Sequence, residues 1–106
     1  MRPSSPTLLA LLALAAAAAP ATAQDAAALR QTALAATGAN CHGTQGHAVA
    51  GAAVPGLAGM PASYMAEQLK AFKAGTRPAT VMHQLAKGFS EAQVEQVAAY
   101  FAAQKP

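Results

Sequence analysis

The chain has 106 residues, a formal net charge of +3 and a single cysteine. This charge is too small for nucleic-acid binding, which needs a dense basic surface, and one cysteine excludes an internal disulfide. The chain has no tryptophan and few other aromatic residues, and its many alanines would make a thin core for so small a domain. A large apolar group is therefore expected to complete the core.

The first 23 residues have the features of a cleavable signal peptide. A basic start precedes an unbroken leucine and alanine run at residues 8–19, and residues 21–23 form a small-x-small cleavage site. The run is short for a bilayer, so we favour cleavage over an uncleaved anchor. We expect a mature chain that begins at Gln24 in a bacterial periplasm, without stable membrane insertion, and that forms one domain over residues 24–106.

Hydrophobic periodicity predicts a first helix over residues 25–37, which Gly38 would end. Its expected apolar face consists of Leu29, Ala33 and Ala36. A glycine-rich loop follows at residues 43–59, and loops of this length are usually functional or disordered.

A second helix is predicted to open at Pro61 and to end at Gly75. Met65 lies on its apolar side, which indicates a core position. Residues 76–89 are predicted to be irregular, apart from a helical turn at residues 81–86.

The last helix has the clearest pattern. Ser90 is its expected N-cap and Gln93 completes a capping box. The apolar positions that follow at helical spacing are Val94, Val97, Ala98 and Phe101. No strand pattern competes, so the fold is predicted to be all-α. We expect the first and last helices to cross, with Val97, Tyr100 and Phe101 pressed against the alanine face.

Residues 38–42, Gly-Ala-Asn-Cys-His, form a motif with chemical meaning. They match the Cys-x-x-Cys-His motif of covalent haem attachment, with Gly38 in the place of the first cysteine. Cys41 can still form a thioether to a haem vinyl group, and His42 can supply an imidazole nitrogen to the iron. The motif therefore predicts haem c with one thioether, unless Gly38 is simply a glycine that ends a helix.

Several segments resemble class I cytochromes c. Residues 40–46 are similar to their haem-binding segment, and residues 55–61 with the helix after them resemble the small bacterial cytochromes of the c4 and c553 kind. Residues 79–90 are most similar to the haem subunit of flavocytochrome c sulfide dehydrogenase. The resemblance implies an all-α class I cytochrome c fold, with three main helices and long loops wrapped around one haem. It also implies an electron carrier that catalyses nothing alone and whose redox partner is a sulfide-oxidising flavoprotein or an oxidase.

The same resemblance implies a set of site residues. His42 would be the proximal iron ligand, and the Pro55 carbonyl would receive the free ring N–H of that histidine. Met82 would be the sixth ligand, since it precedes the last helix, where the chain can cover the far face of the haem. Met60 and Met65 are the alternatives.

Two other classes of function stay open. A haem-free copper(I) protein could use soft ligands drawn from Cys41, His42, His47, Met82 and His83, although no compact Met-x-x-Met or His-x-x-Met pattern occurs. A degenerate cytochrome domain could survive as a binding module. His47 and His83 lie outside any motif and are predicted to be surface residues.

A basic rim for an acidic partner could be formed by Lys70, Lys73, Arg77 and Lys87. We favour the simpler interpretation that these are ordinary solvated charges.

Overall fold

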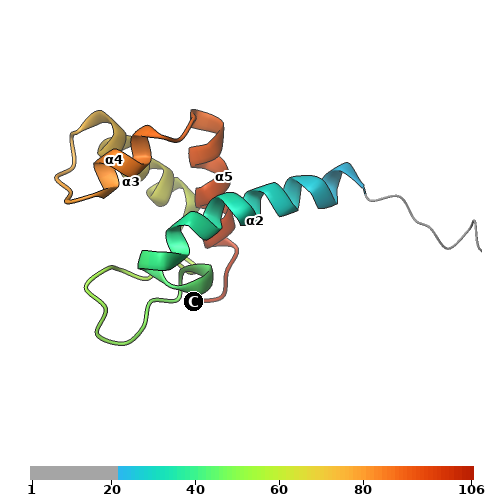
Figure 1. Ribbon diagram of the computed structural model, residues 1–106, viewed down its shortest axis with the longest axis horizontal. Helices are drawn as coiled ribbons and strands as arrows, with labels where there is room; N and C mark the ends of the chain where they lie inside the picture. The colour runs from blue at the N-terminus through green and yellow to red at the C-terminus, as the bar shows by residue number, and fades with distance from the viewer. Residues whose placement is uncertain (1–21) are drawn as a thin grey trace, which may run out of the picture.

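The protein is all-α, as its sequence predicts. The computed structural model describes residues 22–106, so the predicted signal peptide lies outside the described residues except for its last two positions. The helices in chain order are α2 (Ala23–His42), the short 3₁₀ helix η1 (Thr44–Gly46), α3 (Ala62–Ala74), α4 (Met82–Lys87) and α5 (Glu91–Ala102) (Figure 1). Among these residues there is no strand, and no helix there has the length and apolar character to cross a bilayer.

Helix α2 is longer than predicted at both ends. Thr22 is its N-cap, and Thr22 and Asp25 form a capping box that satisfies backbone N–H groups of the first turn. The helix ends at Gly43, whose φ of 85° suits glycine. The prediction that Gly38 ends the helix is wrong: Gly38 lies inside α2, and its φ is not positive. Helix-favouring alanines on both sides outweigh the intrinsic cost of one interior glycine.

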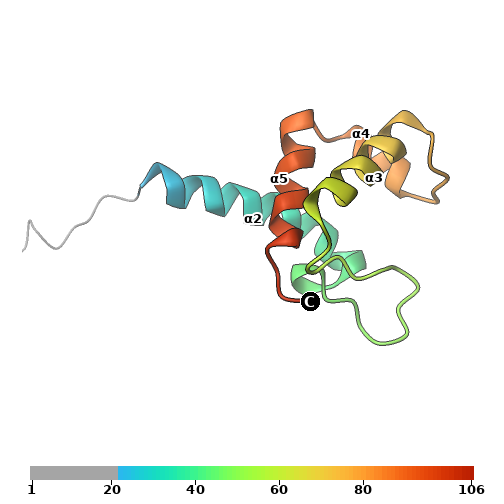
Figure 2. The ribbon, with the colours of Figure 1, turned by 180° about the vertical axis from the view of Figure 1, so that it is seen from behind.

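The N-terminal part of α2 extends away from the rest of the domain (Figures 1 and 2), and residues 22–30 are all exposed. Cleavage after Ala23 would remove the Thr22 cap from this exposed end.

The last part of α2 packs across α5, which confirms the predicted contact of the first and last helices (Figure 2). The packed face is not the predicted one. Leu29 is 71% exposed, and Ala33 and Ala36 are exposed as well. Instead, Leu34 and Ala35 contact the core. Because alanines occur on every side of α2, the sequence pattern did not identify the buried stripe.

Helices α3, α4 and α5 form the rest of the core. Gly75 ends α3 in the left-handed conformation, with φ 78°, and the Ser90–Gln93 capping box opens α5, both as predicted. The four apolar positions predicted for α5 are all buried, as is Met65 of α3. Among residues 22–106, the remaining buried apolar residues are Ala35, Ala66, Leu69 and Ala86. Small side chains thus make up much of this core.

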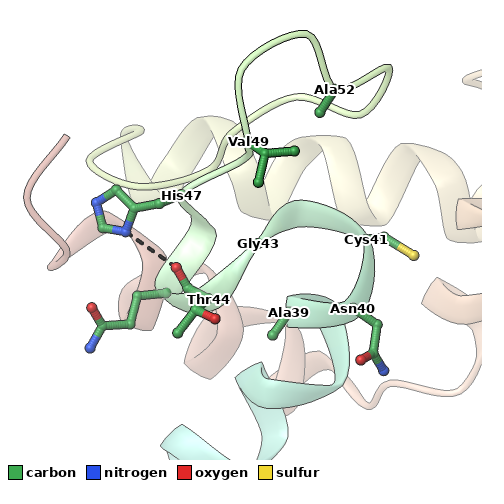
Figure 3. Close-up of a pocket in the computed structure, with 9 residues that line it drawn as sticks. Ala39, Asn40, Cys41, Gly43, Thr44, His47, Val49 and Ala52 are labelled. Carbon is green, nitrogen blue, oxygen red and sulfur yellow. Dashed lines mark hydrogen bonds between the residues drawn. The ribbon is translucent and has the colours of Figure 1, made fainter.

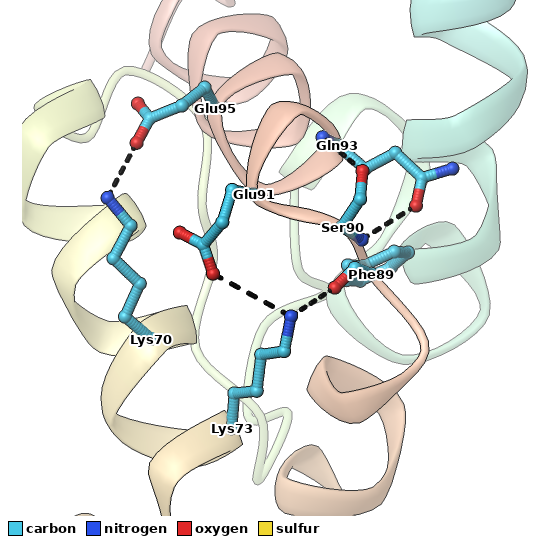
Figure 4. A network of polar contacts seen from close by, with 7 residues as sticks. All are labelled: Lys70, Lys73, Phe89, Ser90, Glu91, Gln93 and Glu95. Carbon is cyan, nitrogen blue, oxygen red and sulfur yellow. Dashed lines mark hydrogen bonds and ion pairs between the residues drawn. The ribbon is translucent and has the colours of Figure 1, made fainter.

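Polar contacts join α3 to α5 (Figure 4). Lys70 Nζ lies 2.7 Å from a Glu95 carboxylate oxygen. Lys73 Nζ donates to the Phe89 carbonyl at 2.6 Å and lies 3.7 Å from Glu91.

Arg77 lies over the Phe72 ring, 4.6 Å from its centroid. Three of the four cations that could have formed a basic rim therefore have partners within the chain.

Candidate haem site

The imidazole of His42 is held by a backbone carbonyl. His42 is the last residue of α2 and is buried, with 8% of its surface exposed. Its Nδ1 lies 2.7 Å from the carbonyl oxygen of Pro55, the contact that the resemblance implies. Because a carbonyl can only accept, Nδ1 carries the hydrogen and donates it. The lone pair is then on Nε2, the nitrogen that can bind a metal.

Glycines allow the loop after α2 to bring Pro55 to His42. Gly43 has φ 85°, and a β-carbon there would collide with the His47 carbonyl. Gly46 has φ 82°, and its β-carbon would lie 2.8 Å from the Ala58 nitrogen and 2.9 Å from Cδ1 of Phe101. The Gly46 carbonyl accepts hydrogen bonds from Leu57 N at 2.8 Å and Ala58 N at 3.3 Å. These contacts fix the segment that carries Pro55.

Cys41 is a free, exposed cysteine at the end of α2. An open hollow of about 550 Å³ lies between this end of the helix and the loop that includes Val49 and Ala52. Figure 3 shows the Cys41 sulfur pointing outward, on the side away from His47. Because Cys41 is exposed and is also one of the residues that line this hollow, its thiol is accessible to a group that approaches the end of α2.

Gly38 lies one helical turn before Cys41. A β-carbon built on Gly38 would lie 3.6 Å from Cζ of Phe101, which is ordinary van der Waals contact. The position that a first cysteine would occupy can therefore accept a side chain, but this chain offers only Cys41 for a thioether.

The three candidate methionines lie in different surroundings. Met65 is buried in the core, 6% exposed. Met82 is the first residue of α4, within the helical turn predicted at residues 81–86, and is partly buried against the core, as is Met60. The end of α2 that carries His42 and the start of α4 lie on the same side of α5 (Figures 1 and 2).

The two remaining histidines differ from each other. His47 is exposed, as predicted, and its Nδ1 and Nε2 lie 3.2 Å and 2.7 Å from the carbonyl oxygens of Thr44 and Lys105. His83 was predicted to be a surface residue but is partly buried. Its Nδ1 is buried and has no hydrogen-bond partner within residues 22–106. Within the same residues, no three His, Cys, Asp or Glu side chains gather in a metal-binding cluster.

An all-helical domain with a cysteine–histidine pair at a helix end and a carbonyl-oriented imidazole has the features of a c-type cytochrome. The model of the cytochrome c family matches residues 26–105, and the chain belongs to this family. Its fold is the class I cytochrome c fold. Membership implies haem c as the cofactor, the group that carries electrons in this family.

One curated relative has a more specific description. The thiosulfate dehydrogenase electron acceptor of Thiomonas intermedia (strain K12) is 46% identical over 50 residues. The aligned segment covers 47% of this chain and 23% of the relative. The chain therefore matches less than a quarter of that protein.

The residues of this structure fit haem c. His42 offers Nε2 with its ring already oriented, Cys41 offers an accessible thiol, and Met82 offers a thioether. In addition, buried polar atoms nearly always have a hydrogen-bond partner. The buried Nδ1 of His83, the residue after Met82, has none within residues 22–106, which fits a site where a bound group such as haem would supply one.

Proposed function

We propose that the protein carries single electrons on one haem c, attached through one thioether from Cys41, with His42 and Met82 as the axial ligands. The observation that carries this proposal is the 2.7 Å contact between His42 Nδ1 and the Pro55 carbonyl. That contact leaves Nε2 as the metal-binding nitrogen of the residue next to the only cysteine.

When bound, the haem supplies a reversible one-electron couple. The protein residues set how readily it accepts the electron. The Pro55 carbonyl orients the His42 ring and makes it a more basic ligand. The thioether of Met82 favours reduced iron and so raises the reduction potential.

Met82 is a better distal ligand than Met60 because of where the loop lies. Pro55 contacts His42, so the segment that follows Pro55 would lie on the same side of a bound haem as His42. Met60 closes this segment, with its backbone N–H donating to the Leu57 carbonyl at 3.2 Å. Met82 belongs instead to α4, which packs on α3. Because Met82 lies on a different element from the loop that carries Pro55, it would be free to hold the haem from the other side.

The electron donor is proposed to be a periplasmic dehydrogenase that oxidises a reduced inorganic sulfur compound. Two independent features support it: the similarity of residues 79–90 to the haem subunit of a sulfide-oxidising flavocytochrome, and the relative described as the electron acceptor of thiosulfate dehydrogenase. The periplasmic location is supported by the predicted signal peptide. A freely diffusing carrier that serves an oxidase is the second candidate.

Stopped-flow reduction of the purified oxidised protein distinguishes these donors. Rapid reduction is expected when a sulfide-oxidising flavoprotein with sulfide, or a thiosulfate dehydrogenase with thiosulfate, is added, and not with either sulfur compound alone. If neither enzyme accelerates reduction while a terminal oxidase oxidises the reduced protein, the diffusing carrier is correct. The N-terminal residue of periplasmic material should be Gln24, and material that retains residues 1–23 would contradict the predicted cleavage.

A further inference from the structure

We propose that His47 is a positioning residue for the haem ligand: it fastens the C-terminal segment (residues 103–106) beneath the loop that holds Pro55 against His42. This inference rests on the proposed function, because it concerns the orientation of the proposed proximal ligand.

The first observation is a contact between distant parts of the chain. His47 Nε2 lies 2.7 Å from the carbonyl oxygen of Lys105, a residue 58 positions later. The other ring nitrogen, Nδ1, lies 3.2 Å from the carbonyl of Thr44 in η1 (Figure 3). Both partners are carbonyl oxygens, which only accept, and a neutral imidazole carries one N–H, so we assign the hydrogen to Nε2, which makes the shorter contact. That bond to the Lys105 backbone depends on the His47 ring and on the path of the chain, not on the Lys105 side chain.

The second observation is that the C-terminal segment also touches the other end of the same loop. The Gly59 N–H donates at 2.9 Å to the carbonyl of Phe101 in α5, just before the segment begins, and Pro106 of the segment itself reaches Gly59. A β-carbon on Gly59 would lie 2.6 Å from Cγ of Pro106, so the proline ring rests directly on the Gly59 backbone. His47 precedes Pro55 in the loop and Gly59 follows it, and residues 103–106 are held by both.

These contacts lead to His42 through backbone hydrogen bonds. Leu57 N–H donates to the Gly46 carbonyl at 2.8 Å, next to His47. Pro55 therefore lies between two fixed points, and its carbonyl is held 2.7 Å from His42 Nδ1. If the C-terminal segment is released, this carbonyl gains freedom to move, the bond to Nδ1–H weakens, and the imidazole becomes a less basic ligand.

The test compares four variants of the haem-loaded protein with the parent. They are His47→Leu, His47→Gln, Lys105→Ala and a chain truncated after Gln104. His47→Leu and the truncation both remove the contact. His47→Gln keeps a donor, and Lys105→Ala keeps the accepting carbonyl. The measurements are NMR hydrogen exchange in the reduced protein, at His42 Nδ1–H and at the Leu57 and Gly59 amides, and the reduction potential.

In His47→Leu and in the truncated chain, we expect exchange at these three positions to accelerate about fivefold, the factor that one ordinary hydrogen bond confers, and the reduction potential to rise. Lys105→Ala should show the exchange rates and the reduction potential of the parent. His47→Gln should give values between those of the parent and those of His47→Leu. The truncated chain provides the answer if His47→Leu does not fold.

A lower melting temperature with unchanged His42 Nδ1–H exchange and unchanged potential would overturn the inference, because His47 would then be merely structural. Failure of the proposed function looks different: the parent protein would contain no haem. In that case the Leu57 and Gly59 amides of the same variants still decide whether His47 holds the loop, and unaltered exchange there overturns the inference.

Discussion

Gly38 faces the ring of Phe101 across the contact between α2 and α5. A β-carbon on Gly38 would lie 3.6 Å from Cζ and 3.9 Å from Cε2 of that ring, and Phe101 itself is only 2% exposed. The residue that replaces the first cysteine of the haem motif is therefore a helix-interior position beside the core. It is not a helix terminator that requires a glycine.

This geometry predicts that side chains at Gly38 are tolerated. Gly38→Ala should raise the free energy of unfolding by about 0.5–1 kcal/mol, because glycine inside a helix loses more backbone entropy on folding. Thermal or urea unfolding measures the change. Gly43→Ala is the matched control: with φ 85° and a collision with the His47 carbonyl, it should destabilise the protein. If Gly38→Ala also destabilises, the modest gap to Phe101 does not accommodate a methyl group.

Gly38→Cys should restore the second thioether. The reduced α-band of the pyridine adduct should move to the blue, because a second haem vinyl group is consumed. A second covalent link should also raise stability by restraining the unfolded chain, as a cross-link does. Gly38→Ser is the control, since it adds a similar side chain without a thiol. A band that does not move in Gly38→Cys would show that the position does not reach a vinyl group.

Phe101→Ala should destabilise the protein by roughly 3–5 kcal/mol, as truncation of a buried phenylalanine usually does. The ring contacts α2 at Gly38 and the loop at Gly46, so its loss leaves a cavity where three segments meet. Leu29→Ala is the comparison: Leu29 is 71% exposed, and the change should stay within about 0.5 kcal/mol. Similar losses in the two variants would contradict the packing of α2 described here.

Met82→Ala should abolish the weak sulfur-to-iron band near the red end of the oxidised spectrum and lower the reduction potential. Met60→Ala should retain the band, since Met60 directly follows the loop that carries Pro55, the residue in contact with His42. Both residues are partly buried against the core, so both variants lose some stability, and only the spectrum and the potential separate them. The opposite pattern would make Met60 the distal ligand.

The Lys70–Glu95 pair should contribute a stabilisation that depends on pH and salt. The hydrogen bond and the charge of Glu95 raise the pKa of the Lys70 ammonium above its ordinary value. The contribution of this pair to the free energy of unfolding is therefore fully present below the ordinary lysine pKa. It is lost as the pH rises through the raised pKa of Lys70. Lys70→Met should lower the melting temperature slightly at neutral pH and low salt. Since the pair is exposed, the difference from the parent should shrink in high salt; a difference that persists would contradict an electrostatic origin.

Local signals in the sequence predicted part of this fold well. The Ser90–Gln93 capping box and the Gly75 helix end depend on residues within one turn of each other, so they could be identified without tertiary information. The buried face of α2 could not, because its alanines carry no periodicity, and the packed positions depend on where α5 lies. The Thr22 cap fell inside the predicted signal peptide and was missed.

In the candidate site too, the features set by neighbouring residues could be predicted, and the contacts between distant residues could not be derived from the sequence pattern. Cys41 and His42 were found from adjacent residues in one motif. The pairing of His42 with Pro55 came from resemblance, since the two residues are 13 positions apart in a loop with no periodic pattern. The contact of His47 with Lys105 had no sequence signal, because it joins backbone and side chain across 58 residues and only the folded chain brings them together.

Covalent attachment of haem through Cys41 is the central claim, and the mass of the intact, acid-denatured protein from periplasmic material tests it most directly. The account predicts that the chain carries the mass of one haem after acid–acetone extraction, that fragmentation places it on Cys41, and that Cys41→Ser releases it. A parent chain at its plain polypeptide mass, with all haem in the extract, would contradict attachment by a single thioether.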